Sequence, residues 1–153
     1  ASRAYLPSNI AAAVKAKLVK TVQTMKMGTV EDFSNFVNAV IDEKSFNNIS
    51  KFIATVKKDK QAKILVGGNV NKTNGWFVEP TVIDTKNPKS LTMCEEIFGP
   101  VLPVLTYRDK EEVIAYVNSK EKPLRRFLFS WLSILVPKLF PEPLVLYQIL
   151  ELV

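Results

Sequence analysis

The sequence predicts an α/β domain in which a mostly parallel sheet is flanked by helices. Two observations carry this prediction. Some segments repeat apolar residues at the three- and four-residue spacing of a helix face, and short apolar, β-branched runs bounded by glycine and proline lie between them. The resulting order of strand, helix, helix, strand, strand, helix fits a parallel sheet better than a bundle or a sandwich.

The first half of the chain is predicted to be mainly helical. Arg3–Pro7 is typical of the end of a short strand, and Ser8 is expected to be the N-cap of a helix that Gly28 closes. The apolar stripe of this helix consists of Ile10, Val14, Leu18, Val22 and Met25. A second helix is predicted from about Asp42 to Lys58. Its buried face consists of Phe46, Ile49, Ile53 and Val56.

The second half supplies the strands. Lys63–Val66 is a short apolar run that ends at a pair of glycines, Gly67-Gly68, and Asn74-Gly75 marks a tight turn. Trp76–Asp84 is strand-like but is interrupted by Pro80, which indicates an edge strand or a strand entry.

A further strand and a helix end this part of the chain. Pro100–Tyr107 is an apolar, β-branched run that predicts a strand. Asp109 with Glu112 three residues later resembles a capping box, and the following helix face is predicted to consist of Val113, Ile114 and Val117.

Composition limits the classes of function. The 153 residues carry a formal net charge of +6, which invites a nucleic-acid hypothesis only if the charges cluster. The densest basic run is Lys57, Lys58, Lys60 and Lys63. We expect these lysines to be solvated helix faces rather than a phosphate-binding stripe, so no nucleic-acid partner is expected.

The chain has one cysteine, Cys94, and no histidine. This excludes an internal disulfide, a Cys–His or Ser–His catalytic pair and a zinc site of the Cys/His type, so no metal site is expected. Single-cysteine usage fits a reducing compartment. Ala1–Pro7 has no apolar core of a signal peptide, so none is expected.

The end of the chain differs in kind. Residues 125–153 are mostly apolar but are interrupted by Pro137, Pro141 and Pro143. The run falls short of the about 20 consecutive apolar residues that a membrane span needs. We expect an extra hydrophobic segment that packs on the domain or is foreign to it, with a membrane-associated tail as the alternative.

Two motifs resemble the aldehyde dehydrogenase superfamily: Phe77–Thr81 (FVEPT) and Glu95–Val101 (EEIFGPV). The resemblance implies that Glu96 hydrogen-bonds the nicotinamide ribose hydroxyls of NAD and that Phe98 packs beside the nicotinamide ring. A carboxylate can accept from two adjacent hydroxyls, and an aromatic side chain can support a ring face. The alternative is that Glu96 is a surface acid and Phe98 a core residue.

Other stretches narrow the branch. Met25–Ile41 (MKMGTVEDFSNFVNAVI) resembles the branch that oxidises L-glutamate γ-semialdehyde to glutamate in proline degradation, in the mitochondrial matrix. Ala1–Pro7 resembles the segment that follows the nucleophile in that branch, which places the catalytic cysteine about two positions before Ala1. Tyr116–Leu124 is instead more similar to the broader superfamily, including fatty-aldehyde enzymes, so that branch stays open.

The resemblance covers residues 1–124 and implies a partial catalytic domain, followed by an unmatched tail at 125–153. It implies NAD-dependent oxidation of a small aldehyde by a homo-oligomeric parent enzyme. No catalytic residue is assigned in this chain: Gly67-Gly68 lacks the further glycines of a phosphate loop, and Cys94 is expected to be a plain loop or core thiol. We therefore expect the chain to be inactive on its own.

We attribute the tail to a frameshift, an unspliced segment or an incorrect gene model rather than to an evolved function. A non-catalytic interaction module that uses the apolar tail is the alternative to a dehydrogenase fragment.

Overall fold

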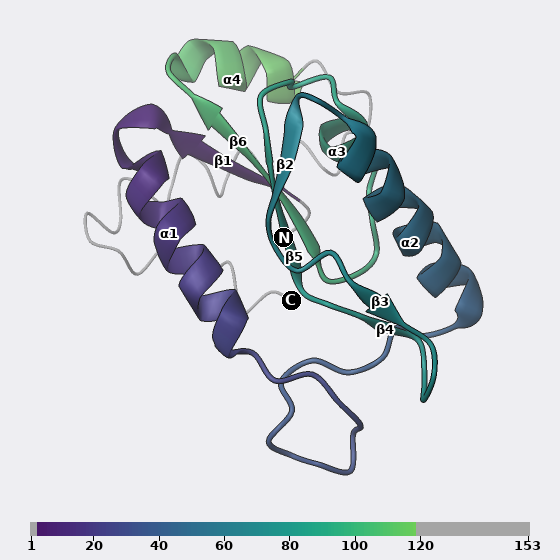
Figure 1. Cartoon of the computed structure of the whole chain (residues 1–153). Coiled ribbons are helices and arrows are strands. Elements are labelled where there is room, and N and C mark those ends of the chain that lie inside the picture. The colour runs from purple at the N-terminus through teal and green to yellow at the C-terminus, as the bar shows by residue number, and fades with distance from the viewer. Residues whose placement is uncertain (1–2, 119–153) are drawn as a thin grey trace.

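Helices cover both faces of a four-stranded sheet in the computed structural model, which describes residues 3–118 (Figure 1). In chain order the elements are β1 (Ala4–Pro7), α1 (Ser8–Thr24), α2 (Glu43–Lys58), β2 (Ala62–Val66), β3 (Val70–Asn71), β4 (Phe77–Val78), β5 (Thr81–Thr85), α3 (Leu91–Cys94), β6 (Val101–Tyr107) and α4 (Lys110–Asn118). The apolar tail predicted at 125–153 lies outside the described residues.

The main sheet has the strand order β1-β6-β5-β2. β1 pairs with β6, and β6 with β5, in parallel, whereas β5 pairs with β2 in antiparallel fashion. The predicted mostly parallel sheet is therefore confirmed. β2 runs the other way: its connection to β5 contains the β3–β4 hairpin and no crossover helix, which is the usual link between parallel neighbours.

Helix α1 packs on one face of the sheet largely as predicted. Leu18 and Val22 are buried, and Val14 and Met25 pack against the same cluster. Ile10 was predicted to share this face, but it is 47% exposed, and Ala11 takes the inward position. A small residue lets the helix approach the sheet closely, so the most apolar residue of the first turn is not the one that faces inward.

Both predicted ends of α1 are wrong. Pro7 holds the N-cap position with φ −65° and ψ 140°, and Ser8 is already the first helical residue. The fixed φ of proline leads directly from β1 into the helix without a capping side chain. The helix ends at Thr24, with Met25 in an extended conformation, so Gly28 lies in the following loop rather than closing the helix.

Helix α2 matches its prediction closely and covers the opposite face. Asp42 is the N-cap: its carboxylate accepts a hydrogen bond from the backbone amide of Ser45 at 2.7 Å, and this bond lowers the pKa of Asp42. The predicted face is buried in one cluster, which Phe52 joins, and its members are Phe46, Ile49, Ile53 and Val56. The alternating side chains of β5 divide between the layers, because Val82 packs with α1 and Ile83 with α2.

The strand entry at Pro80 is confirmed. Glu79 and Pro80 separate β4 from β5, so proline precedes an interior strand whose first residue, Thr81, is buried. β2 ends, as predicted, at Gly67-Gly68, where both glycines have positive φ of 77° and 88°. The densest lysine run is exposed, and Lys57 Nζ donates to the Gly68 carbonyl at 2.8 Å. That lysine therefore has a role within the fold.

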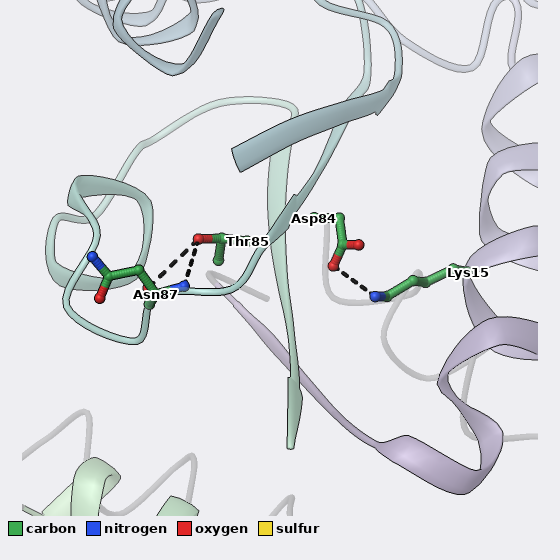
Figure 2. Close-up of polar contacts among 4 residues, drawn as sticks. All are labelled: Lys15, Asp84, Thr85 and Asn87. Atoms are coloured by element: carbon green, nitrogen blue, oxygen red, sulfur yellow. Dashed lines mark hydrogen bonds and ion pairs between the residues drawn. The ribbon is translucent and has the colours of Figure 1, made fainter. Parts of the chain in front are cut away.

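One ion pair ties α1 to the sheet (Figure 2). Lys15 Nζ lies 2.6 Å from Asp84 Oδ1, and the two side chains are 19% and 27% exposed. A partly exposed pair of this kind contributes up to about 1 kcal/mol. The same figure shows the next residue of β5, Thr85, whose hydroxyl accepts from the amide of Asn87 at 3.3 Å and so shapes the turn that follows the strand.

Helix α4 begins where predicted, with a difference in its cap. The carboxylate of Asp109 accepts from the amide of Glu111 at 2.9 Å, one residue earlier than a capping box with Glu112 requires. The predicted face is half-buried, and its members are Val113, Ile114 and Val117. No helix within residues 3–118 is long and apolar enough to cross a membrane.

Candidate functional site

The predicted site residues lie in the loop 95–100, which connects α3 to β6. This loop meets the amino end of β6, and the register of the parallel pair aligns Thr81 of β5 with Val101 of β6. Glu96 is half-buried, and Phe98 is 84% exposed. The alternative that Phe98 is a core residue is therefore wrong.

Backbone hydrogen bonds fix both ends of the loop 95–100. At the α3 end, the amide of Glu95 donates to the Leu91 carbonyl at 2.9 Å. At the β6 end, the amide of Thr81 donates to the Pro100 carbonyl at 2.8 Å, which extends the β5–β6 pairing into the loop. The loop is thus attached to the sheet and is not a free connection.

Packing decides which side chains of this loop face outward. Ile97 packs against the cluster beneath α2, and Gly99 approaches Ile49 so closely that an added Cβ would lie 2.4 Å from Ile49 Cδ1. Residues 97 and 99 therefore face the protein. Phe98 between them presents an aromatic ring to the outside while its backbone is held on both sides. A ring in this position can support a planar ligand at no cost in core packing.

A charged residue from the start of the chain contacts the same loop. Arg3 is only 8% exposed, and its Nη2 donates to the Glu95 carbonyl at 2.8 Å. The contact joins residues that are 92 positions apart in the sequence. Our interpretation of the sequence did not identify it. The available signal was an arginine directly before a short buried strand, where a charge needs a polar partner.

The thiol of Cys94 lies at the end of α3, directly before the loop, and is exposed. Exposure excludes a core thiol, and Cys94 is the last residue of α3 rather than a residue of the loop. The start of α3 is fixed by buried hydroxyl groups: Ser90 and Thr92 are 2.7 Å apart, and Thr85 donates to Ser90 at 3.3 Å. Nearby, the Tyr116 hydroxyl donates to the Pro88 carbonyl.

Tyr5 of β1 is the titratable group most strongly affected by this environment. Burial is the largest cause and raises its pKa to about 12, with a smaller contribution from the neighbouring Tyr116 phenol. Arg3 opposes the rise because a positive charge favours phenolate. The Tyr5 side chain is therefore a neutral phenol in the folded state at neutral pH.

We expect this shift to make folding stability depend on pH in alkaline solution. A pKa raised above the usual value of about 10 means that the folded state holds the proton longer than the unfolded chain does. The contribution of the neutral Tyr5 phenol to the free energy of unfolding is fully present below pH 10 and is lost as the pH rises towards 12. Urea unfolding of Tyr5→Phe should show a shallower decline over this window than the unchanged chain, and equal slopes would contradict the shift.

The segment with the branch resemblance, Met25–Ile41, forms most of the loop between α1 and α2. The loop is closed by its own backbone, because the Gly28 amide donates to Val37 at 3.1 Å, and the Val40 amide donates to Trp76 at 2.9 Å. The first bond lies within the loop, and the second connects it to the β3–β4 hairpin rather than to the loop 95–100. Phe33 within this segment is 99% exposed.

Gly67-Gly68 is not a phosphate loop. The amide of Gly68, which would have to face a phosphate, donates to the Thr81 hydroxyl at 2.9 Å, so it is used inside the fold. No group of three or more His, Cys, Asp or Glu side chains within residues 3–118 is placed to hold a metal ion.

Comparisons with known proteins agree on one family. A family model described as "Aldehyde dehydrogenase family" matches residues 1–131. The mitochondrial delta-1-pyrroline-5-carboxylate dehydrogenase of Dictyostelium discoideum is 50% identical over 110 residues, which are 72% of this chain and 20% of that protein. The enzyme of the same name from Bos taurus is 40% identical over 121 residues, with 77% and 22% covered.

Solved structures show the same relationship. An NAD+ complex of an aldehyde dehydrogenase from Bacillus cereus superposes with a TM-score of 0.73 at 29% identity, covering 78% of this chain and 24% of that one. A delta-pyrroline-5-carboxylate dehydrogenase from Mycobacterium tuberculosis bound with NAD gives 0.68 at 27% identity, covering 76% and 21%. The chain spans about a fifth of the length of the curated relatives it matches.

Proposed function

The chain belongs to the aldehyde dehydrogenase family, and from that premise we propose that its loop 95–100 forms the wall against which the nicotinamide end of NAD is held. Glu96 accepts hydrogen bonds from the nicotinamide ribose hydroxyls, and Phe98 packs beside the ring. The observation that carries this proposal is the Phe98 ring, 84% exposed on a loop whose flanking residues are anchored.

The fit of the dinucleotide rests on charge and shape. Glu96 is half-buried, so its carboxylate is partly shielded from water, which strengthens a hydrogen bond to a hydroxyl. NAD supplies the acceptor for the hydride that leaves the aldehyde. This chain contributes the positioning of the cofactor. Its loop 95–100 holds the Glu96 carboxylate and the Phe98 ring at fixed places relative to β6.

We further propose that the whole protein oxidises L-glutamate γ-semialdehyde to glutamate in proline degradation, in the mitochondrial matrix, as a homo-oligomer. The names of the two relatives described above support this substrate, and both of these proteins, at 50% and 40% identity, are called mitochondrial. In this proposal, residues 1–124 are part of the catalytic domain and the nucleophilic cysteine precedes Ala1. The segment foreign to the domain lies within residues 125–153, of which the family match covers 125–131.

The test is a substrate comparison on the full-length product of the gene that encodes this chain. We expect NAD reduction with L-glutamate γ-semialdehyde and little with long-chain aliphatic aldehydes. The opposite preference would favour the fatty-aldehyde branch, which the segment Tyr116–Leu124 resembles. No reduction with either class would favour a non-catalytic interaction module, and the reading frame before Ala1 would show whether a cysteine is encoded there.

The 153-residue chain by itself is expected to bind NAD very weakly. One charged hydrogen bond contributes about 1.5–3 kcal/mol, whereas a dissociation constant of 1 mM already requires about 4 kcal/mol. The residues that this structure describes offer no phosphate cradle to supply the rest. Calorimetry with NAD should therefore give a dissociation constant above 1 mM. Micromolar affinity would contradict the proposal that this chain supplies only one side of the NAD site.

A further inference from the structure

We propose that Arg3 is a positioning residue for the dinucleotide wall, the name used here for the loop 95–100 with Glu96 and Phe98. Its guanidinium holds the loop 95–100 by the Glu95 carbonyl and so sets where Glu96 and Phe98 lie. The inference rests on the proposed function, because it assigns to Arg3 an effect on NAD that acts through these two residues.

The contact has the properties of a fixed attachment. Arg3 is 8% exposed, and a buried charge persists only where polar groups compensate for the lost water. One such group is the Glu95 carbonyl, 2.8 Å from Nη2. Because Glu95 and Glu96 share a peptide unit, a shift of that carbonyl moves the backbone of Glu96 directly.

The loop needs this attachment at one end more than at the other. At its β6 end, the Thr81–Pro100 hydrogen bond continues a five-residue parallel pairing, so the sheet fixes it. At its other end stands α3, a helix of four residues. So short a helix gains little stability from its own hydrogen bonds and depends on contacts from elsewhere. Arg3 provides such a contact at Glu95, the residue before Glu96.

The position of Arg3 follows from the sheet. The register of β1 on β6 pairs Ala4 with Val104, so Arg3 precedes an edge strand that lies beside β6. From there its long side chain reaches the chain that enters β6 at its amino end. The planar guanidinium presents several donors in a fixed arrangement, which the single ammonium of lysine does not reproduce. The length and charge of lysine nevertheless allow partial replacement.

The kinetic test uses the full-length gene product. For Arg3→Met we expect the KM for NAD to rise at least tenfold while the KM for the aldehyde changes less than twofold. Arg3→Lys should recover part of the loss. Lys15→Met is the matched control, because it removes a cation that pairs with Asp84 of β5 and not with a residue of the loop 95–100. Its KM for NAD should stay within twofold of the unchanged enzyme.

A second measurement uses the 153-residue chain itself. Hydrogen–deuterium exchange of the backbone amides at 95–99 should become faster in Arg3→Met than in Lys15→Met. Equal exchange in the two variants would mean that Arg3 does not hold the loop, and it would overturn the inference without any reference to catalysis.

The outcomes separate this inference from the proposed function. If Glu96→Gln and Phe98→Ala leave the KM for NAD unchanged, the proposed function is wrong. If those variants raise it and Arg3→Met does not, or if Arg3→Met raises both KM values equally, only the positioning role is wrong. Should Arg3→Met give no soluble protein, Arg3→Lys decides, because a KM for NAD equal to that of the unchanged enzyme overturns the proposal.

Discussion

Glu96→Gln should lower kcat/KM for NAD by about 10- to 100-fold in the full-length gene product, because a charged hydrogen bond worth about 1.5–3 kcal/mol becomes a neutral one or is lost. The substitution keeps the size and shape of the side chain. The free energy of unfolding should therefore change by no more than about 1 kcal/mol, because the amide keeps the packing of this half-buried side chain. Steady-state kinetics with varied NAD measures the first quantity, and urea unfolding measures the second.

The neighbouring acid provides a matched control. Glu95 is exposed, and the structure uses its backbone carbonyl rather than its carboxylate to receive Arg3. Glu95→Gln makes the same chemical change one residue away and should leave kcat/KM for NAD within twofold. If both substitutions lower it equally, the effect is one of net charge near the site, and the specific role of Glu96 is wrong.

Phe98 adds an independent arm to this comparison. Its ring is 84% exposed, so its removal creates no core cavity, and Phe98→Ala should fold normally. The loss of a ring that supports the nicotinamide should raise the KM for NAD. Phe98→Leu keeps an apolar surface without a ring, so its KM for NAD should lie between those of Phe98→Ala and the unchanged enzyme. A Phe98→Ala enzyme with unchanged NAD kinetics would remove the aromatic half of the proposed wall.

The sequence predicts those elements whose signals are local. α2 is the clearest case, because Asp42, its N-cap partner Ser45 and the buried face from Phe46 to Val56 all lie within one helix length. The strands at 62–66 and 101–107 are likewise marked by apolar runs with glycine or proline beside them. For these segments, periodicity and capping chemistry agree with the tertiary structure.

Features that depend on distant partners are not predictable in this way. Strand direction has no local signal, so the antiparallel pairing of β2 with β5 was not foreseen. Ala11 faces the sheet instead of Ile10 because the surface of the sheet, and not the apolar character of the residue, decides. The hydrogen bond of Arg3 to Glu95 joins residues that are 92 positions apart. The exposure of Phe98 has no local signal either, because its neighbours Ile97 and Gly99 lie against a cluster that includes Ile49, a residue distant in sequence.

Among the glycine-to-alanine substitutions, Gly67→Ala should be the most destabilising. Gly67 has φ +77°, and a Cβ there would lie 2.2 Å from the carbonyl oxygen of Pro80. Left-handed backbone costs a residue with a side chain about 1–2 kcal/mol. The clash adds to that cost because a backbone oxygen cannot turn away as a side chain can, so we expect a total loss of about 3–5 kcal/mol in the free energy of unfolding, in the range of severe single mutations.

Gly68→Ala is the control that isolates the clash. Gly68 has a similar φ of +88°, but its nearest neighbour would be Ile64 Cδ1 at 3.0 Å, the end of a flexible side chain. For Gly68→Ala the free energy of unfolding should fall only by the cost of the left-handed backbone, about 1–2 kcal/mol. Urea unfolding of the two variants measures the difference. Equal losses would show that the Pro80 carbonyl moves easily and that the corner formed by Gly67 and Pro80 is not rigid.

The same pair of variants connects the corner to the site. Pro80 precedes Thr81, whose amide holds the Pro100 carbonyl at the end of the loop 95–100. A Cβ at residue 67 that displaces Pro80 therefore moves the β6 end of the loop, whereas a Cβ at residue 68 meets Ile64 instead. Gly67→Ala should consequently raise the KM for NAD in the full-length product more than Gly68→Ala does, at a temperature where both remain folded. If the corner were independent of the dinucleotide wall, the two variants would differ in stability alone.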